Sequence, residues 1–286
     1  MRAPVPVRPR ALVRRGHAAL GAALGLVLLA GCSGTPDPSS SGGSASSGLA
    51  IADTHVHAIE RAGPTGGILL ATHDGLWVED GSQLRQVGPR IDLMSFSVVD
   101  GTTYRASGHP GPDVDLPQPV GLIETRDAGQ TWSALSREGE SDFHLLEVTD
   151  TITVGFDGAL RSSADGQTWR IAQTPEGLID LALRPDGQDL LASTADGLLL
   201  SQDRGTYWDP VRSAPPMVLL DWADKDTVVG ISDAGAVHVS TDGGSTWEER
   251  EQLDSVIQAM STSRTREGGI ELLVAEDADF RAVMIP

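Results

Sequence analysis

The sequence repeats a short turn-like segment about every 39 residues, and this repetition limits the possible folds more than any other feature. Four segments of one pattern each end in a tryptophan, and the spacings between successive tryptophans are 37, 39 and 39 residues. The four segments read TRDAGQTW (125–132), SSADGQTW (162–169), SQDRGTYW (201–208) and STDGGSTW (240–247). A constant period of this length indicates one small structural unit that recurs, each copy packing against the next.

A second repeating signature surrounds these segments: a β-rich run, a turn and another β-rich run. It occurs at 68–78, 103–125, 152–163, 190–201, 228–240 and 272–284, and a further apolar run precedes each copy. Several short strands per unit, without sustained helical periodicity, are typical of a propeller blade. We therefore predict an all-β, six-bladed β-propeller over residues 51–286, with seven blades or an open array as the alternatives. The sixth unit ends after its third strand, so we expect Gly48–Ala52 to supply the fourth.

The four tryptophan segments resemble the Asp-box, or BNR repeat, S-x-D-x-G-x-T-W, of sialidases and related β-propellers. The fourth copy matches every fixed position, whereas Thr125, Ala164 and Tyr207 replace a fixed residue in the others. In such a box the Asp and Ser/Thr side chains bond to the backbone of a tight turn, and the Trp fills the blade interior. The box is therefore expected to stabilise a hairpin and not to form an active site. The structural Asp-box residues are Asp127, Trp132, Trp169, Asp203, Trp208, Asp242 and Trp247.

The amino terminus has the features of an export signal. Residues 1–31 carry arginines followed by the apolar run Ala18–Ala30, which is too short to span a membrane comfortably. Leu29–Cys32 resembles the bacterial lipobox, and this resemblance implies a lipid on the thiol of Cys32, the only cysteine in the chain. The alternative is an ordinary secretory signal with an incidental cysteine. The segment 32–50 is rich in Ser, Gly and Pro, which predicts a flexible linker. We thus expect an extracytoplasmic lipoprotein anchored to the cell membrane.

Composition excludes several classes of protein. After the first fifteen residues the chain holds 16 basic and 40 acidic side chains, a net charge of −24. A protein with so strong a negative charge repels the phosphate backbone of nucleic acids, which excludes nucleic acid as a partner. A single cysteine excludes an internal disulfide framework and a cysteine-based zinc site. We expect a monomer.

Five of the seven histidines are predicted to lie at one rim of the propeller. In a propeller the first strand of each blade lines the central channel, and ligands usually bind at the face where these strands begin. His55, His57, His73, His109 and His144 all fall at first-strand starts or at second-to-third-strand turns of units 1–3. With Asp53, Asp74 and Asp142 nearby, neutral imidazoles there could bind Zn²⁺ or Cu²⁺. The alternative is that they are turn-forming and channel-lining histidines bonded to the backbone.

A hydrolase is the competing class of function. The resemblance to sialidases implies a tyrosine nucleophile with a glutamate partner, an aspartate acid and three arginines. The chain has only Tyr104, on an expected second strand, and Tyr207, inside an Asp-box, so the sialidase catalytic residues are not recognisable. A two-carboxylate glycoside hydrolase would have Asp142, Glu147 or Glu60 as its candidates. The alternative is that these three are solvated acids of a very acidic protein.

Further strings are similar to those of a group of actinobacterial secreted proteins that are often labelled glycosylhydrolases or exo-sialidases. These strings are THVHAIE, ATHDGLW, SGHPGPD, GLIETRDAGQTW and DFHLLEV, and the resemblance covers nearly all of residues 53–250. It implies the propeller, but it implies an activity by label alone, because fold does not establish function. We therefore predict a binding module whose mouth on blades 1–3 takes a metal ion, a glycan or a protein, with a sialidase-like glycoside hydrolase as the alternative.

Overall fold

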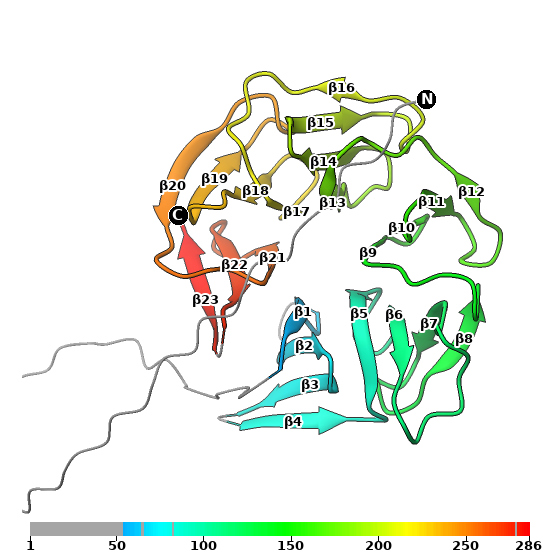
Figure 1. Cartoon of the computed structure of the whole chain (residues 1–286). Coiled ribbons are helices and arrows are strands. Elements are labelled where there is room, and N and C mark those ends of the chain that lie inside the picture. Colours follow the sequence, from blue (N-terminus) through cyan, green and yellow to red (C-terminus); the bar gives the residue numbers. More distant parts are fainter. Residues whose placement is uncertain (1–53, 64–65, 82, 278) are drawn as a thin grey trace, which may run out of the picture. The chain divides into compact units, whose positions relative to one another are not determined.

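The structure, a computed structural model, describes residues 54–63, 66–81, 83–277 and 279–286. All of them belong to one compact unit. Regular structure in these ranges consists of β-strands, and no helix there is long and apolar enough to cross a membrane. The strands form six antiparallel sheets arranged around a common centre (Figure 1). The predicted six-bladed β-propeller is thus confirmed.

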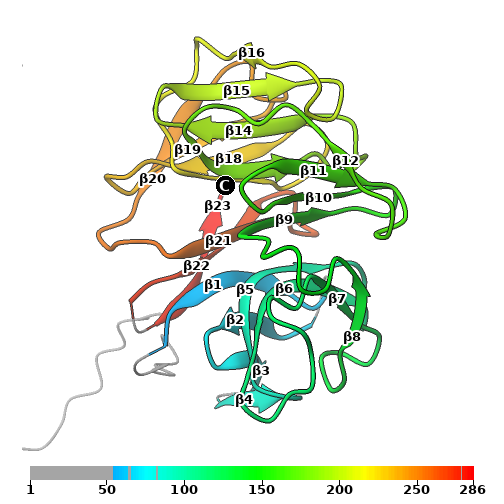
Figure 2. The same cartoon turned by 45° about the vertical axis from the view of Figure 1, so that its right-hand side comes forward.

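Each blade contains consecutive strands that follow one another outward from the centre, as β1 to β4 do in Figure 2. Blade 1 consists of β1 (Val56–Arg61), β2 (Ile68–Thr72), β3 (Gly75–Asp80) and β4 (Gln83–Val87). Blade 2 consists of β5 (Ile91–Val98), β6 (Tyr104–Pro110), β7 (Leu122–Thr125) and β8 (Ser133–Ser136). Blade 3 consists of β9 (Leu145–Val148), β10 (Thr153–Phe156), β11 (Leu160–Ser163) and β12 (Arg170–Ile171).

The second half of the ring repeats this order. Blade 4 consists of β13 (Leu178–Leu183), β14 (Leu190–Thr194), β15 (Gly197–Ser201) and β16 (Asp209–Pro210). Blade 5 consists of β17 (Leu219–Trp222), β18 (Val228–Ile231), β19 (Ala236–Ser240) and β20 (Glu248–Gln252). Blade 6 has three strands among the described residues: β21 (Ala259–Arg264), β22 (Ile270–Ala275) and β23 (Phe280–Ile285).

The last blade packs directly against the first. One hydrophobic cluster contains Ile59 and Leu70 of blade 1 together with Leu273 of blade 6. The Arg61 guanidinium also donates two hydrogen bonds, of 2.7 and 2.8 Å, to the carboxylate of Glu271. These contacts join the two ends of the described ring. The predicted closing strand Gly48–Ala52 lies outside the described residues, as do the predicted signal peptide, Cys32 and the linker.

The core lies between blades more than within them. Each Asp-box tryptophan joins a hydrophobic cluster that spans its own blade and the preceding one; the four are Trp132, Trp169, Trp208 and Trp247. The Trp169 indole N–H, for example, donates a 2.9 Å hydrogen bond to Ser136 Oγ in blade 2. The tryptophans therefore bind neighbouring blades together, whereas the sequence predicted that each would fill its own blade.

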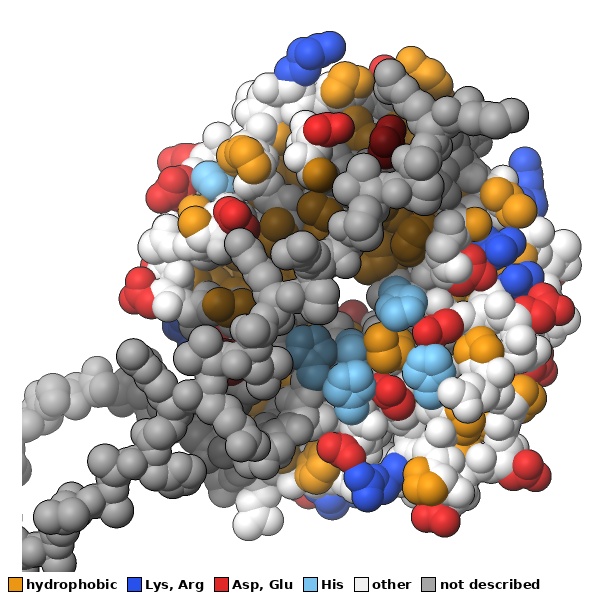
Figure 3. All heavy atoms as spheres, in the orientation of Figure 1, with side chains coloured by type: hydrophobic (Ala, Val, Ile, Leu, Met, Phe, Trp, Pro, Cys, Tyr) orange, Lys and Arg blue, Asp and Glu red, His pale blue; other side chains and the backbone are white. Residues whose placement is uncertain are grey.

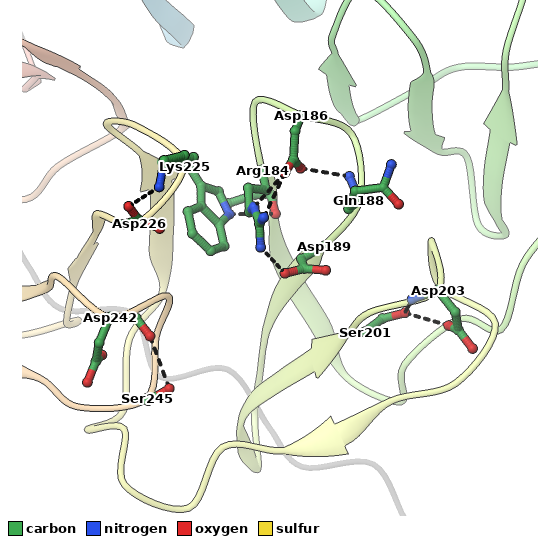
Figure 4. A network of polar contacts seen from close by, with 12 residues as sticks. Arg184, Asp186, Gln188, Asp189, Ser201, Asp203, Lys225, Asp226, Asp242 and Ser245 are labelled. Carbon is green, nitrogen blue, oxygen red and sulfur yellow. Dashed lines mark hydrogen bonds and ion pairs between the residues drawn. The ribbon is translucent and has the colours of Figure 1, made fainter.

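The Asp-boxes form tight turns between the third and fourth strands, as the repeat predicts. In the fourth box Asp242 Oδ1 accepts hydrogen bonds from Ser240 Oγ and the Thr246 N–H, both 2.8 Å long. The Thr246 hydroxyl, which donates to Asp242 Oδ2, lowers the pKa of Asp242 most, followed by the Thr246 N–H and Ser240 Oγ. Gly244 has φ +89°, a conformation that side chains rarely adopt. Figure 4 shows Asp242 beside Ser245, and Ser201 beside Asp203 of the third box.

The second box keeps its aspartate, although the sequence alignment placed Ala164 at that position. Asp165 accepts the hydrogen bonds from Ser163 Oγ and from the Thr168 N–H that the box aspartate accepts elsewhere. The turn between Asp165 and Gly166 is one residue shorter than in the other boxes, which shifted the apparent alignment by one position.

Candidate metal centre

A channel runs through the centre of the ring and is lined by all six innermost strands. It encloses about 350 Å³, and its lining includes His57 and Glu60 of β1, Glu147 of β9, Asp180 of β13 and Asp221 of β17. At one mouth the space-filling view shows histidine side chains gathered on the side formed by blades 1–3 (Figure 3). The blade order thus brings residues that are distant in sequence to one opening.

Short-range structure fixes the histidines of blade 1. His55 and His57 stand on either side of Val56, where β1 begins, and their ring centroids are 4.8 Å apart. His73 occupies the two-residue turn between β2 and β3. Thr72 Oγ1 holds this turn, because it donates to the Gly75 carbonyl and accepts from the Asp74 N–H. The turn therefore places the His73 ring beside those of His55 and His57, with ring centroids 5.9 and 4.5 Å away.

A first cluster of possible metal ligands consists of His57, His73 and Asp92. Their ligating atoms all lie within 4.8 Å of one another. His57 Nε2 is 3.3 Å from His73 Nδ1, and His73 Nδ1 is 2.8 Å from Asp92 Oδ1. His57 Nε2 lies 4.0 Å from the same carboxylate oxygen. Zn–N and Zn–O bonds of about 2.0–2.2 Å at tetrahedral angles separate neighbouring ligand atoms by about 3.3–3.5 Å, so this spacing suits a metal ion of that size.

His57 is held in the neutral form that a metal requires. Burial first, and then repulsion by His73, His55 and His144, together lower the pKa of His57 from 6.5 to about 4. Its side chain is only 12% exposed, whereas that of His73 is 49% exposed. Above pH 5 the His57 imidazole therefore offers a lone pair without competition from a proton.

A second cluster, His109, Asp142 and His144, lies beside the first. Asp142 Oδ2 is 3.2 Å from His109 Nε2 and 3.1 Å from His144 Nε2. Asp142 Oδ1 and His109 Nδ1 are buried atoms without a hydrogen-bond partner in the described ranges. Two imidazoles, one from blade 2 and one from the start of blade 3, thus approach a single carboxylate oxygen.

Blade 2 positions the loop that carries the second cluster. The Phe143 N–H donates to Ser107 Oγ at 3.0 Å, and Ser95 Oγ donates to the Phe143 carbonyl at 2.6 Å. These buried bonds fix the backbone between Asp142 and His144 against β5 and β6. The flanking side chains are therefore presented to the mouth by a rigid support.

Deeper in the channel, three carboxylates connect successive blades. Glu147 Oε2 accepts the Leu183 N–H at 3.3 Å, and Asp180 Oδ2 accepts the Leu220 N–H at 2.8 Å. Asp221 Oδ2 accepts from both the N–H and the hydroxyl of Thr262, the latter at 2.9 Å. The three pairs are Glu147 to Leu183, Asp180 to Leu220 and Asp221 to Thr262. In each pair the carboxylate accepts a backbone N–H at the unpaired edge of the next blade's innermost strand.

The same burial keeps protons on the channel acids. It raises the pKa of Glu60 to about 8, with a smaller contribution from the charge of Asp221. It raises the pKa of Asp180 to about 7 and that of Asp221 to about 6. The pKa of Glu147 is also raised well above its usual value, by burial first and then by neighbouring carboxylates. At neutral pH this part of the channel therefore holds protonated carboxyl groups beside ionised ones.

The structure separates the acids that the sequence grouped as catalytic candidates. Glu60 and Glu147 line the channel, whereas Asp142 belongs to the histidine clusters at the rim. Asp74 pairs with Arg90, and Asp53 lies outside the described residues. The aspartates of the four boxes lie in third-to-fourth-strand turns, away from the first-strand starts that carry the histidines.

Sequence reasoning missed Asp92, Asp180 and Asp221. Asp92 opens β5 in the register position opposite His109, so its signal was its place at a first-strand start. Asp180 and Asp221 occupy the middle of innermost strands, as Glu60 and Glu147 do. The recurring acid in apolar runs such as HAIE, HLLE, LID and LLD was the available signal.

No protein-family model and no curated protein matches this sequence. Solved structures match its fold. YCF48 bound to D1 peptide superposes with a TM-score of 0.58 at 17% identity, covering 82% of this chain and 95% of that one. The GH74 enzyme of Niastella koreensis gives 0.54 at 13% identity, covering 83% of this chain and 46% of the enzyme. An ancestral GH74 enzyme gives 0.54 at 13% identity, covering 79% and 39%. The chain thus spans under half of either GH74 enzyme, and these likenesses establish a β-propeller fold.

Proposed function

We propose that this chain is a binding propeller that holds a divalent transition-metal ion, Zn²⁺ or Cu²⁺, at the mouth formed by blades 1–3. The convergence of His57 Nε2, His73 Nδ1 and Asp92 Oδ1 carries the proposal. Two imidazoles and one carboxylate are a ligand set that suits these borderline cations. Three protein ligands leave a coordination position for water or for a group of a partner molecule.

Titration of the purified full-length chain with Zn²⁺ and with Cu²⁺ tests this proposal. At a free concentration of about 100 times Kd the ion would stabilise the fold by about 2.7 kcal/mol. That corresponds to a rise in Tm of roughly 5–10 °C for a domain of this size. A titration with neither heat nor a shift in Tm contradicts the proposal.

A variant separates the cluster from adventitious binding. His73 is half exposed and lies in a turn, so His73→Gln removes one ligand with little risk to folding. We expect an affinity loss of at least about tenfold, as even indirect ligand contacts contribute that much. The matched control is His238→Gln, because His238 lies on β19 of blade 5. Equal losses in both variants would place the metal elsewhere.

The location of the protein is part of the proposal. The lipobox-like Leu29–Cys32 supports a lipid anchor on Cys32 and an extracytoplasmic propeller tethered by the segment 32–50. Two or more acyl chains would hold it stably at a membrane, where one chain is marginal. Cys32→Ser should move the protein from the membrane fraction to the soluble fraction, and an unchanged distribution contradicts the anchor.

One observation supports a hydrolase as the second candidate. Glu60 and Glu147 line the same channel, and both have raised pKa values, as the general acid of a glycosidase does. A panel of fluorogenic glycosides that includes sialosides tests this activity. Turnover that Glu60→Gln and Glu147→Gln both abolish would favour the sialidase-like hydrolase, and no turnover would exclude these substrates.

A further inference from the structure

The mouth of the channel has two chemically different halves. At the first-strand starts, blades 1–3 carry His57, Asp92 and His144, whereas blades 4–6 carry aliphatic residues. In the view of Figure 3, hydrophobic side chains lie above the central opening and histidines lie below and beside it. We call the aliphatic set the apolar rim; it consists of Ile179, Val218, Leu219, Val256 and Ile257.

The apolar rim is exposed and borders two adjoining cavities. The side chain of Val256 is 73% exposed and that of Ile179 is 44% exposed. A cavity of about 230 Å³ lies beside the channel, between blades 5 and 6, and shares Val218, Leu219 and Ile257 with it. Exposed apolar side chains that adjoin one another mark a binding surface more often than a surface without function. The apolar surface therefore continues from the channel outward across the mouth.

The first cluster and the apolar rim belong to the same opening. His57, a ligand of the first cluster, lines the channel together with Ile179 and Leu219. Three protein ligands leave one position of a tetrahedral ion open. A molecule that takes this position from the channel side therefore has the apolar rim within its reach. One ligand can thus use the ion and the aliphatic side chains at the same time.

The charge of the mouth selects the donor group of that ligand. Asp180 and Asp221 line the channel, Asp233 lines the neighbouring cavity, and the whole chain is strongly acidic. An anionic donor is repelled there, whereas a neutral imidazole is not, and imidazole is a preferred ligand of Zn²⁺ and Cu²⁺. Two adjoining cavities suit successive side chains of an extended segment better than one compact molecule.

We infer that the mouth binds a segment of another protein in which a histidine stands between aliphatic residues. The imidazole takes the open position of the ion, and the aliphatic side chains cover the apolar rim. Basic residues at the ends of the segment would be attracted by the acidic surface. This inference rests on the proposed function of the first cluster, and it names the partner of that site.

Calorimetric titration of the Zn²⁺-loaded full-length chain with three peptides tests the inference. The first peptide is Ac-KLLHLLK-NH₂, the second has serine in place of each leucine, and the third has glutamine in place of the histidine. We expect the first to bind at least about tenfold more tightly than either of the others, because burial of one leucine side chain alone contributes that much. Without Zn²⁺, the first peptide should bind no better than the third.

A pair of variants locates the contact. Val256→Asn should weaken binding of the first peptide about tenfold and leave the binding of Zn²⁺ unchanged. The matched control is Ile171→Asn, because Ile171 is 72% exposed but lies on β12, the outermost strand of blade 3. It should behave as the wild type. Circular dichroism of both variants verifies that the β-structure is retained.

The possible failures can be told apart. Binding of Zn²⁺ with equal affinity for the leucine and serine peptides leaves the proposed function intact and overturns the role of the apolar rim. Equal affinity for the histidine and glutamine peptides shows that the ion does not take part, and equal losses in Val256→Asn and Ile171→Asn place the peptide elsewhere. A chain that does not bind Zn²⁺ at all eliminates the proposed function together with this inference.

Discussion

Glu60→Gln tests whether the channel acids keep their protons in the folded protein. Burial, aided by the charge of Asp221, raises the pKa of Glu60 from 4.5 to about 8. Folded Glu60 therefore binds its proton more tightly than unfolded Glu60 does. The resulting stabilisation is complete below pH 4.5 and is lost as the pH rises towards 8. Glutamine, which does not titrate, removes this dependence.

The size of the effect follows from the two pKa values. A change from 4.5 to about 8 corresponds to roughly 5 kcal/mol, at 1.36 kcal/mol per pH unit. Glu60 lines a channel that is open to solvent, so we expect about half of this, 2–3 kcal/mol. Between pH 5 and pH 8.5 the wild type should lose that much more unfolding free energy than Glu60→Gln.

Urea unfolding at pH 5 and pH 8.5, with a chelator present, measures the difference. Asp180 and Asp221 also have raised pKa values and act in the same direction, whereas the lowered pKa of His57 acts oppositely. All three groups are present in both proteins and largely cancel in the comparison. Glu138→Gln, at an exposed position, is the matched control and should behave as the wild type. Equal pH dependence in Glu60→Gln and the wild type would refute the reasoning.

Three further predictions concern the stability of the ring. Thr262→Val removes a hydroxyl that is bonded to Asp221 and should lower the unfolding free energy by about 1–2 kcal/mol in urea titrations. The loss should be larger at pH 8.5 than at pH 5, because Asp221, with a pKa of about 6, is ionised at pH 8.5. Asp242→Ala breaks the most complete Asp-box and should cost about 1–2 kcal/mol in the same assay, whereas Asp233→Ala, an exposed control, should cost little. Deletion of residues 45–52 should lower the Tm of the whole propeller, and an unchanged Tm would contradict their predicted role as the closing strand.

The fold could be predicted because its repeating unit contains a chemically demanding turn. A turn that needs a bonding aspartate, a glycine with positive φ and a packed tryptophan leaves a recognisable pattern in each copy. The Asp-box sequence pattern is not matched in the second box, because the turn keeps its hydrogen bonds although it is one residue shorter. Asp165 occupies the role of the box aspartate one residue later than expected, because hydrogen bonds from Ser163 and Thr168 depend on position in space and not on residue count.

Four histidines of the rim could be placed from sequence because each lies at a strand start or in a tight turn. His109 was expected in the turn after the second strand, but it lies on β6 near its end, paired with Asp92. Asp92 could not be recognised in the same way, since no histidine stands next to it in the sequence. Its relation to His73 arises between blades, where the turn of blade 1 reaches the first strand of blade 2. Contacts of this kind depend on the rotation from one blade to the next, which strand periodicity does not specify.

The channel acids show most clearly what the sequence leaves undecided. The innermost strands of blades 1, 3, 4 and 5 each carry an acid after apolar residues, so the sequence around the four acids is similar. Glu147, Asp180 and Asp221 each accept a backbone N–H of the next blade, and their positions are explained by that bond. Glu60 has no such bond in the part of the chain that the structure describes, while it shares the channel and the raised pKa. An acid that bonds to the neighbouring blade and an acid without such a bond therefore look alike in sequence, and only the arrangement of blades distinguishes them.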